Sequence, residues 1–142
     1  MKKILVIGTG GTIASAPTEN GLAPALSAEA LLEAIPFAAS ICEVECTQAF
    51  SLDSTNVCPG HWLMLAGMIK ENYETYDGFV ITHGTDTLAY TAAGLSYLLE
   101  NSSKPIVLTG AQKPMGEDIT DAKQNLIDAL IYASDDESHN IC

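Results

Sequence analysis

The sequence predicts an α/β fold: a doubly wound, mainly parallel sheet with helices on both faces. Short apolar runs alternate along the chain with longer segments whose apolar residues recur at helical spacing. Polar loops, several of them rich in glycine, follow the apolar runs. Strands joined by helical crossovers run parallel, and such sheets bind ligands beyond the carboxyl ends of their strands. The loops after the strands are therefore where we look for chemistry.

The first half of the chain predicts two strands and two helices. In order, these are a buried strand at 3–7, a helix from 27 to 35, a strand near the sheet edge at 42–48 and a helix from 59 to 69. Ser27 is placed to cap the first helix and Pro36 to stop it, and Pro59 suits the first turn of the second.

The second half continues the alternation. We expect a strand at 79–82, a helix from 86 to about 100, a strand at 105–109, a helix capped by Thr120 or Asp121, and a strand that begins at 140–142. The last helix carries Leu126, Ile127, Leu130 and Ile131 at helical spacing.

Length and charge exclude several classes of function. At 142 residues, 47% of them hydrophobic, the chain suits one domain over 1–142 with a sizeable core. Its net charge of −12 opposes binding to nucleic acids and anionic membranes. No apolar run approaches the ~20 residues of a membrane span, and the run at 4–7 is too short for a secretory leader. We expect a cytoplasmic protein that contacts neither nucleic acid nor membrane.

The first loop is rich in glycine. Gly8, Gly10 and Gly11 allow a sharp turn whose N–H groups can hold an anion or a developing oxyanion. A dinucleotide fingerprint is disfavoured, because Ile13 stands where the third glycine belongs and no acidic residue clearly ends the second strand. Taken alone, this loop fits a structural turn equally well.

The other loops are dense in hydroxyl and carboxyl groups. The cluster at 52–56 can hold a carboxylate, although in isolation an ordinary turn is the better interpretation. Thr85 and Asp86 stand where an N-cap is ordinary, and we expect His83 to be a hydrogen-bonded structural residue. Lys113 in the fourth loop is expected to be solvated.

The cysteines Cys42, Cys46, Cys58 and Cys142 are dispersed without a CxxC pair, so the sequence indicates neither a zinc ribbon nor a disulfide framework. Cys42 and Cys46, four residues apart, could be metal ligands, but buried thiols in a β-rich stretch are the better interpretation. We expect no metal and no cofactor.

Four segments together resemble the bacterial-type L-asparaginase family. Residues 9–14 and 83–87 look like its two signature motifs, and 52–56 look like its substrate-carboxylate loop. Residues 108–112, followed by 120–122 and 125–126, match the segment that leads into its next helix. The resemblance covers the whole chain in order, and the two signatures together are highly specific.

The resemblance implies an amidohydrolase that cleaves L-asparagine to L-aspartate and ammonia through a covalent acyl-enzyme, without a cofactor. Thr12 would be the nucleophile and Thr85 would assist proton transfer. Asp86 would form the acidic partner of Thr85 and hold the α-ammonium group of the substrate. The other implied substrate-binding residues are Gly11, Ser54, which would hold the α-carboxylate, and Thr55 beside it.

The chain also departs from the family. Family enzymes are more than twice as long, with a second, smaller domain and a catalytic lysine downstream of Cys142, so this chain corresponds to an incomplete N-terminal domain and is expected to be inactive alone. Leu22 stands where the family has a tyrosine that assists the nucleophile, and Asn56 where an aspartate is common. The family implies a homo-oligomer.

Two rival functions remain. One is the asparaginase-like subunit of a tRNA-dependent amidotransferase, which is disfavoured by the acidic charge and by the start of this chain directly on its first strand. The other is a non-catalytic module that binds an amino acid or a nucleotide. The sequence does not choose between L-asparagine and L-glutamine as the substrate.

Overall fold

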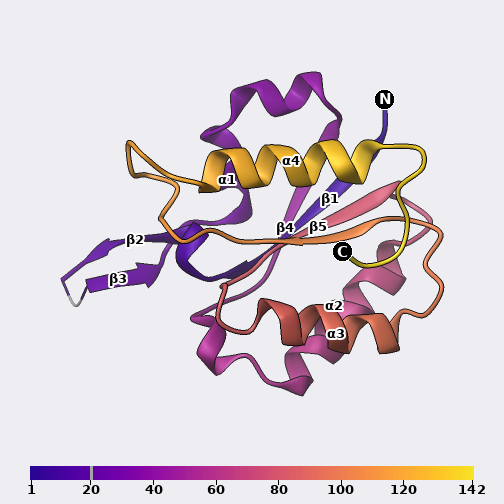
Figure 1. Ribbon diagram of the computed structural model, residues 1–142, viewed down its shortest axis with the longest axis horizontal. Helices are drawn as coiled ribbons and strands as arrows, with labels where there is room; N and C mark the ends of the chain where they lie inside the picture. The colour runs from indigo at the N-terminus through magenta and orange to yellow at the C-terminus, as the bar shows by residue number, and fades with distance from the viewer. Residues whose placement is uncertain (20) are drawn as a thin grey trace.

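Four parallel strands form the central sheet (Figure 1). In this computed structural model, which describes residues 1–19 and 21–142, their order across the sheet is β4, β1, β5, β6. The strands are β1 (Lys3–Gly10), β4 (Glu43–Leu52), β5 (Gly78–Thr82) and β6 (Ile106–Thr109). Neighbouring strands pair in parallel throughout, which confirms the predicted sheet and the edge position of β4.

Helices cover both faces of this sheet, as predicted (Figure 1). They are α1 (Ala28–Glu33), α2 (Pro59–Asn72), α3 (Leu88–Leu98) and α4 (Ala122–Ser134). Side chains of α1 and α4 pack with Ile4, Val6 and Val80 in one core cluster, and those of α2 and α3 pack around Phe79 in the other. Burial of both sheet faces explains why β1 and β5 are nearly continuous apolar runs.

Several short elements were not predicted. Ser15–Thr18 (β2) and Gly21–Pro24 (β3) form an antiparallel two-stranded hairpin beside the main sheet. Three 3₁₀ turns occupy Thr12–Ala14 (η1), Pro36–Ser40 (η2) and Ser54–Asn56 (η3). Two of these turns, η1 and η3, directly follow the carboxyl ends of β1 and β4. Asn20, which the sequence places in the loop after Thr12, lies outside the described residues.

The second strand differs from its prediction. Cys42 precedes β4, and the strand runs four residues past Gln48. The register shifts there, since Gly8 pairs with Gln48 but Gly10 pairs with Leu52. Gln48 is exposed, and its side-chain amide accepts from the Ala28 N–H at 3.1 Å and donates to the Phe50 carbonyl at 2.7 Å.

The extension of β4 also corrects the reasoning about a dinucleotide site. β4 ends at Leu52 and Asp53 follows at once, so an acidic residue does end the second strand. The case against that fingerprint therefore rests on Ile13, which is fully buried in η1.

The helix boundaries in the structure differ by a few residues from the predicted ones. Ser27 caps α1 as predicted by accepting from the Ala30 N–H at 3.3 Å, but the helix ends at Glu33 and η2 follows. α3 begins at Leu88 rather than Asp86, and it ends at Leu98 rather than near Glu100. The N-cap, Thr87, has no side-chain capping bond because its hydroxyl donates to the Ser54 carbonyl at 2.8 Å.

At the start of α4, the two residues predicted as caps have different roles. Asp121 holds the N-cap position without a capping bond, whereas the Thr120 hydroxyl accepts from the Ala122 N–H at 3.0 Å. Ile131 is half exposed, so small residues accompany Leu126 and Leu130 on the buried face. The predicted strand at 140–142 is a single parallel bridge from Ile141 to Ile106. Among the helices of the described residues, none has the length and apolar content to cross a membrane.

Candidate active site

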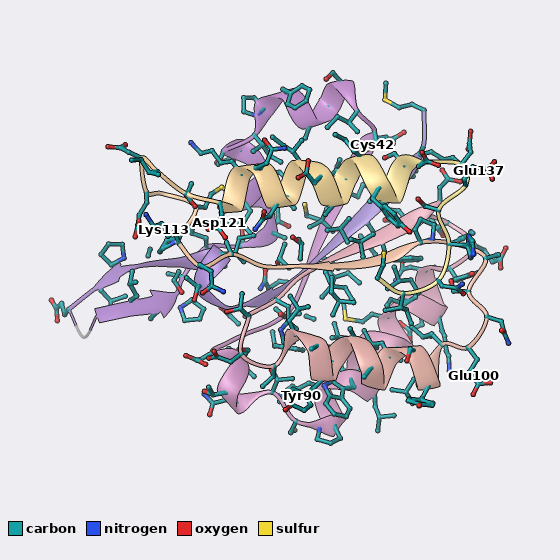
Figure 2. The ribbon with its side chains drawn as sticks, in the orientation of Figure 1. Cys42, Tyr90, Glu100, Lys113, Asp121 and Glu137 are labelled. Atoms are coloured by element: carbon teal, nitrogen blue, oxygen red, sulfur yellow. The ribbon has the colours of Figure 1, made fainter. Side chains whose placement is uncertain are left out.

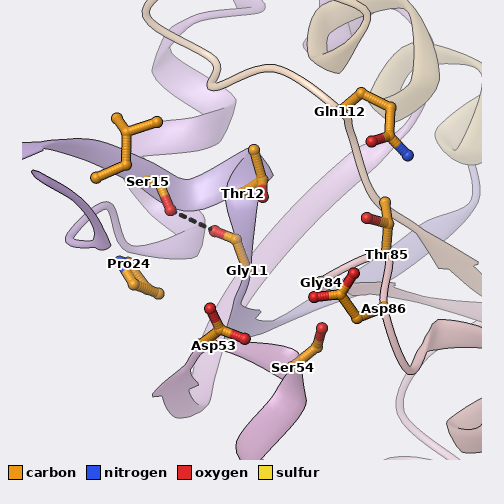
Figure 3. Close-up of a pocket in the computed structure, with 11 residues that line it drawn as sticks. Gly11, Thr12, Ser15, Pro24, Asp53, Ser54, Gly84, Thr85, Asp86 and Gln112 are labelled. Carbon is orange, nitrogen blue, oxygen red and sulfur yellow. Dashed lines mark hydrogen bonds between the residues drawn. The ribbon is translucent and has the colours of Figure 1, made fainter.

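A polar cavity of about 260 Å³ lies at the carboxyl ends of the strands, where the fold predicts a ligand site (Figure 3). All four loops after the strands contribute to it, together with the hairpin. The lining residues are Gly11, Thr12, Ser15, Leu22, Pro24, Asp53, Ser54, Gly84, Thr85, Asp86 and Gln112. A cavity of this size, below the ~300 Å³ at which sites for drug-sized ligands begin, suits a small polar molecule.

The loop after β1 places Thr12 at the cavity. Gly10 and Gly11 have φ angles of 100° and 78°, which a residue with a side chain rarely adopts. The Gly11 N–H donates to the Leu52 carbonyl at 2.9 Å, so this N–H holds β4 instead of being free for an anion. The Ser15 hydroxyl donates to the Gly11 carbonyl at 2.9 Å and closes the turn around Thr12.

The loop after β4 supplies Asp53 and Ser54. One Asp53 carboxylate oxygen accepts from the N–H of Thr55 at 2.9 Å and from its hydroxyl at 2.7 Å. The backbone N–H of Thr55, and then its hydroxyl, lower the pKa of Asp53 below its usual range. Ser54 is buried at the cavity, but Thr55 is exposed and is not among the lining residues. Thr55 therefore supports Asp53 rather than reaching the cavity itself.

The loop after β5 supplies Gly84, Thr85 and Asp86. Asp86 does not cap a helix, because α3 begins two residues later. Figure 3 shows Thr12 on one side of the cavity and Thr85 with Asp86 on the other. The two loops meet closely, since a Cβ atom added to Gly11 would lie 2.4 Å from the Gly84 Cα.

His83 lies beneath this loop and does not line the cavity. It is fully buried, and its Nδ1–H donates to the Gly84 carbonyl at 2.8 Å. The Thr91 hydroxyl donates to its Nε2 at 2.9 Å. Burial lowers the pKa of His83, so the ring is neutral near pH 7. His83 is thus a hydrogen-bonded structural residue, as expected.

The loop after β6 brings Gln112 to the cavity and leaves Lys113 exposed in solvent. Asp121 fixes this loop: its two carboxylate oxygens accept from the N–H of Gln112 at 2.9 Å and of Lys113 at 3.1 Å. Figure 2 shows Asp121 beside Lys113 at the approach to α4. Asn125 ties the same loop by donating to the Gly110 carbonyl at 2.9 Å.

Five of the six residues predicted for the site line one cavity: Gly11, Thr12, Ser54, Thr85 and Asp86. Sequence reasoning missed the contributions of Ser15, Pro24 and Gln112. Gln112 had a signal, because it stands in the polar loop after the fourth strand. Ser15 and Pro24 had none, since the hairpin that carries them was not predicted.

The cavity combines hydroxyl groups with carboxylates. Thr12, Ser15, Ser54 and Thr85 bring hydroxyls, and no lysine, arginine or histidine lines it among the residues the structure describes. Carboxylates attract an ammonium group, while hydroxyls can donate to a carboxylate or attack a carbonyl carbon once a base takes their proton. This arrangement suits a zwitterionic amino acid with a reactive carbonyl group.

Comparison with known proteins agrees with this description of the site. A family model described as "Asparaginase, N-terminal" matches residues 3–142. L-asparaginase from Thermococcus kodakarensis is 46% identical over 132 residues, which are 92% of this chain and 40% of that protein. A glutamyl-tRNA(Gln) amidotransferase subunit from Pyrococcus abyssi is 39% identical over 137 residues, 94% of this chain and 31% of that protein.

Solved structures give the same picture. The thermostable L-asparaginase from Thermococcus kodakarensis superposes with a TM-score of 0.81 at 45% identity, over 92% of this chain and 40% of its own. A probable cytoplasmic L-asparaginase from Campylobacter jejuni superposes with a TM-score of 0.86 at 34% identity, over 99% of this chain and 43% of its own. The chain thus spans less than half the length of these relatives.

Proposed function

We propose, from the premise that this chain belongs to the asparaginase family, that it forms the N-terminal domain of an amidohydrolase that converts L-asparagine to L-aspartate and ammonia. The observation that carries the proposal is that Thr12 shares one small polar cavity with Thr85, Asp86 and Ser54. Similarity to L-asparaginases over nearly the whole chain supports it.

In the proposed reaction, the Thr12 hydroxyl attacks the side-chain amide carbon of the substrate. The proton that leaves Thr12 passes by way of Thr85 and its acidic partner Asp86 to the amide nitrogen of the substrate. That nitrogen then departs as ammonia. Water hydrolyses the resulting threonine ester, which releases L-aspartate and restores the hydroxyl. The N–H of Thr85, which precedes α3, is a donor for the oxyanion of the tetrahedral intermediate.

The α-groups of the substrate would bind at the end of the cavity that Asp86 and Ser54 line. Asp86 would accept from the α-ammonium, and Ser54 would donate to the α-carboxylate. Asp53 adds a second carboxylate beside Ser54. Gly11, whose backbone approaches Gly84 closely, would keep this end narrow enough for a short amino acid.

The proposed site is incomplete in these 142 residues. The family resemblance implies a catalytic lysine and a second, smaller domain that lie beyond Cys142, and a homo-oligomeric assembly. Leu22 lines the cavity from the hairpin, at the place that the resemblance gives to a tyrosine. We therefore propose that the chain alone has little or no activity.

The test compares this chain with a complete parent chain in ammonia release from L-asparagine and L-glutamine. The parent is expected to release ammonia. Its Thr12→Val variant is expected to have a kcat at least about 10³-fold lower, because the hydroxyl nucleophile has been removed. Thr47→Val, which removes a half-buried threonine hydroxyl from β4 outside the cavity, is the matched control. Appreciable turnover by the 142-residue chain would refute the proposal of an incomplete site.

A second candidate is the amidotransferase subunit, favoured by the 39% identity to the relative from Pyrococcus abyssi over 94% of this chain. In that case the parent would release ammonia from its substrate only together with a partner protein and a charged tRNA. Ammonia release by the isolated parent, unchanged on addition of tRNA, would exclude this candidate. Calorimetry with L-asparagine and NAD separates both enzymes from a nucleotide-binding module.

A further inference from the structure

A chain of hydrogen bonds, part-buried at its first bond and buried at the other two, runs from α2 through α3 to the loop after β5. The Trp62 indole N–H donates to the Thr91 hydroxyl oxygen at 3.0 Å, and the Thr91 hydroxyl donates to His83 Nε2 at 2.9 Å. His83 Nδ1–H then donates to the Gly84 carbonyl at 2.8 Å. His83 and Thr91 are fully buried and Trp62 is half-buried. We call these three side chains the relay.

The direction of each bond in the relay is fixed by its ends. An indole nitrogen only donates and a carbonyl oxygen only accepts. Thr91 must therefore accept from Trp62 and donate to His83, and a neutral His83 must carry its proton on Nδ1. The Thr91 hydroxyl both accepts and donates, and each ring nitrogen of His83 has a partner, so no other imidazole tautomer satisfies the relay. Removal of one member leaves a buried group unpaired.

The relay ends at the peptide that enters the cavity. In a trans peptide the carbonyl and the following N–H point in opposite directions. Because the Gly84 carbonyl faces the His83 ring, the Thr85 N–H points away from that ring, and Gly84 and Thr85 both line the cavity. Close packing fixes this peptide from other sides, since a Cβ on Gly84 would lie 2.5 Å from the Ser54 Oγ.

We infer that the relay of Trp62, Thr91 and His83 is a positioning device that sets the orientation of the Gly84–Thr85 peptide for catalysis. The inference rests on the proposed function. The three side chains touch no substrate; they act through Gly84 on the N–H and hydroxyl of Thr85. A donor displaced by about 1 Å can cost ~10²-fold in rate, and this loss falls on the transition state more than on substrate binding.

The sharpest test uses the complete parent chain with Thr91→Val, which keeps the shape of the side chain and removes its hydroxyl. We expect kcat to fall by about 10- to 100-fold while KM changes less than about threefold. Thr91→Ser restores a hydroxyl and is expected to recover most of kcat. Ser96→Ala removes an exposed hydroxyl from the same helix and is the matched control.

Selective ¹⁵N-threonine labelling gives a readout that general destabilisation does not imitate. The Thr85 amide resonance is expected to shift in Thr91→Val and to return to the wild-type position in Thr91→Ser. A lower melting temperature with unchanged kcat and an unmoved Thr85 amide would overturn the inference, as would equal losses in the Val and Ser variants. If the wild-type parent releases no ammonia, the proposed function fails, and the Thr85 amide shift alone then supports or overturns the relay.

Discussion

Three aspartates near the cavity have different surroundings although their side chains are identical. Asp86 and Asp53 line the cavity, where they can meet an ammonium group. Asp121 instead accepts from the backbone N–H groups of Gln112 and Lys113, and these bonds, led by that of Gln112, lower its pKa. Its charge is therefore used to hold a loop. What distinguishes the three carboxylates is which donors surround them.

Gln112 is the one carboxamide among the described residues that line the cavity, and Figure 3 shows it on the same side as Thr85. Under the proposed function this side receives the amide group of the substrate. A carboxamide there tolerates both the substrate amide and the carboxylate of the product, whereas a second carboxylate would repel the product.

We predict that Gln112→Glu in the complete parent weakens L-aspartate binding at least about tenfold more than L-asparagine binding, because like charges a few ångströms apart repel strongly at low dielectric. Calorimetry with both amino acids at pH 7 measures the two losses. Gln124→Glu adds the same charge on α4, away from the cavity, and is expected to change neither affinity appreciably. Equal weakening of both ligands by Gln112→Glu would contradict the prediction.

At the residue scale the sequence is informative where function depends on the position of a loop. Thr12, Ser54, Thr85 and Asp86 all stand just after strands, so the carboxyl-end rule alone draws attention to them. Thr55 could not be separated from Ser54 by sequence, because the two are neighbours and only the turn of η3 directs one inward and the other outward.

At the scale of elements, the loop before α4 depends on the helix that follows it. Asp121 stands at the N-cap position, but its carboxylate reaches back to the loop, and Thr120 does the capping. The helix and the loop are therefore joined through a charge, and a change of pH should act on both.

We predict that Asp121→Asn lowers the stability of the chain at pH 7, and that the difference from wild type shrinks as the pH falls below about 4. The native pKa of Asp121 lies below its ordinary 3.8, so its stabilisation is present above 3.8 and is lost as the pH falls through the native pKa. Urea unfolding at pH 7 and at pH 3 measures this. Asp118→Asn, an exposed carboxylate in the same loop, controls for the change in net charge. A pH-independent difference would contradict the prediction.

Two glycines test the packing of elements against each other. A Cβ on Gly84 would meet Ser54 Oγ at 2.5 Å, so Gly84→Ala should destabilise by about 1–3 kcal/mol, as overpacking does. Gly67 lies within α2 with open space around it, so Gly67→Ala should stabilise by roughly 0.5–1 kcal/mol. Urea unfolding followed by circular dichroism compares the two. Similar effects of both substitutions would show that the close approach at Gly84 carries no packing cost.

The elements that periodicity failed to predict share a physical cause. The β2–β3 hairpin has no apolar alternation, because it stands outside the main sheet and half of its strand residues are exposed. The length of β4 was underestimated because the register shift near Gln48 interrupts its alternation. Such features arise from contacts between distant segments, which a local pattern does not record.

At the scale of the whole molecule, the parallel direction of the strands follows from simple rules. Buried apolar runs alternating with helical segments predict parallel strands with right-handed crossovers, and this leaves few possible arrangements. The position of the site follows from this arrangement, since the four loops after the strands all begin at the carboxyl ends of the sheet. The identity of the reaction does not follow from the fold, and it depends on which side chains these loops carry.

Trp62 is the single tryptophan of the chain, and it stands at the far end of the relay from Gly84. Indole emission responds to changes in the hydrogen bonding and polarity around the ring. The molecule therefore carries its own optical reporter: an amino acid that settles against Thr85 should alter the fluorescence of a residue two side chains removed from it, so that occupancy can be followed without any added dye.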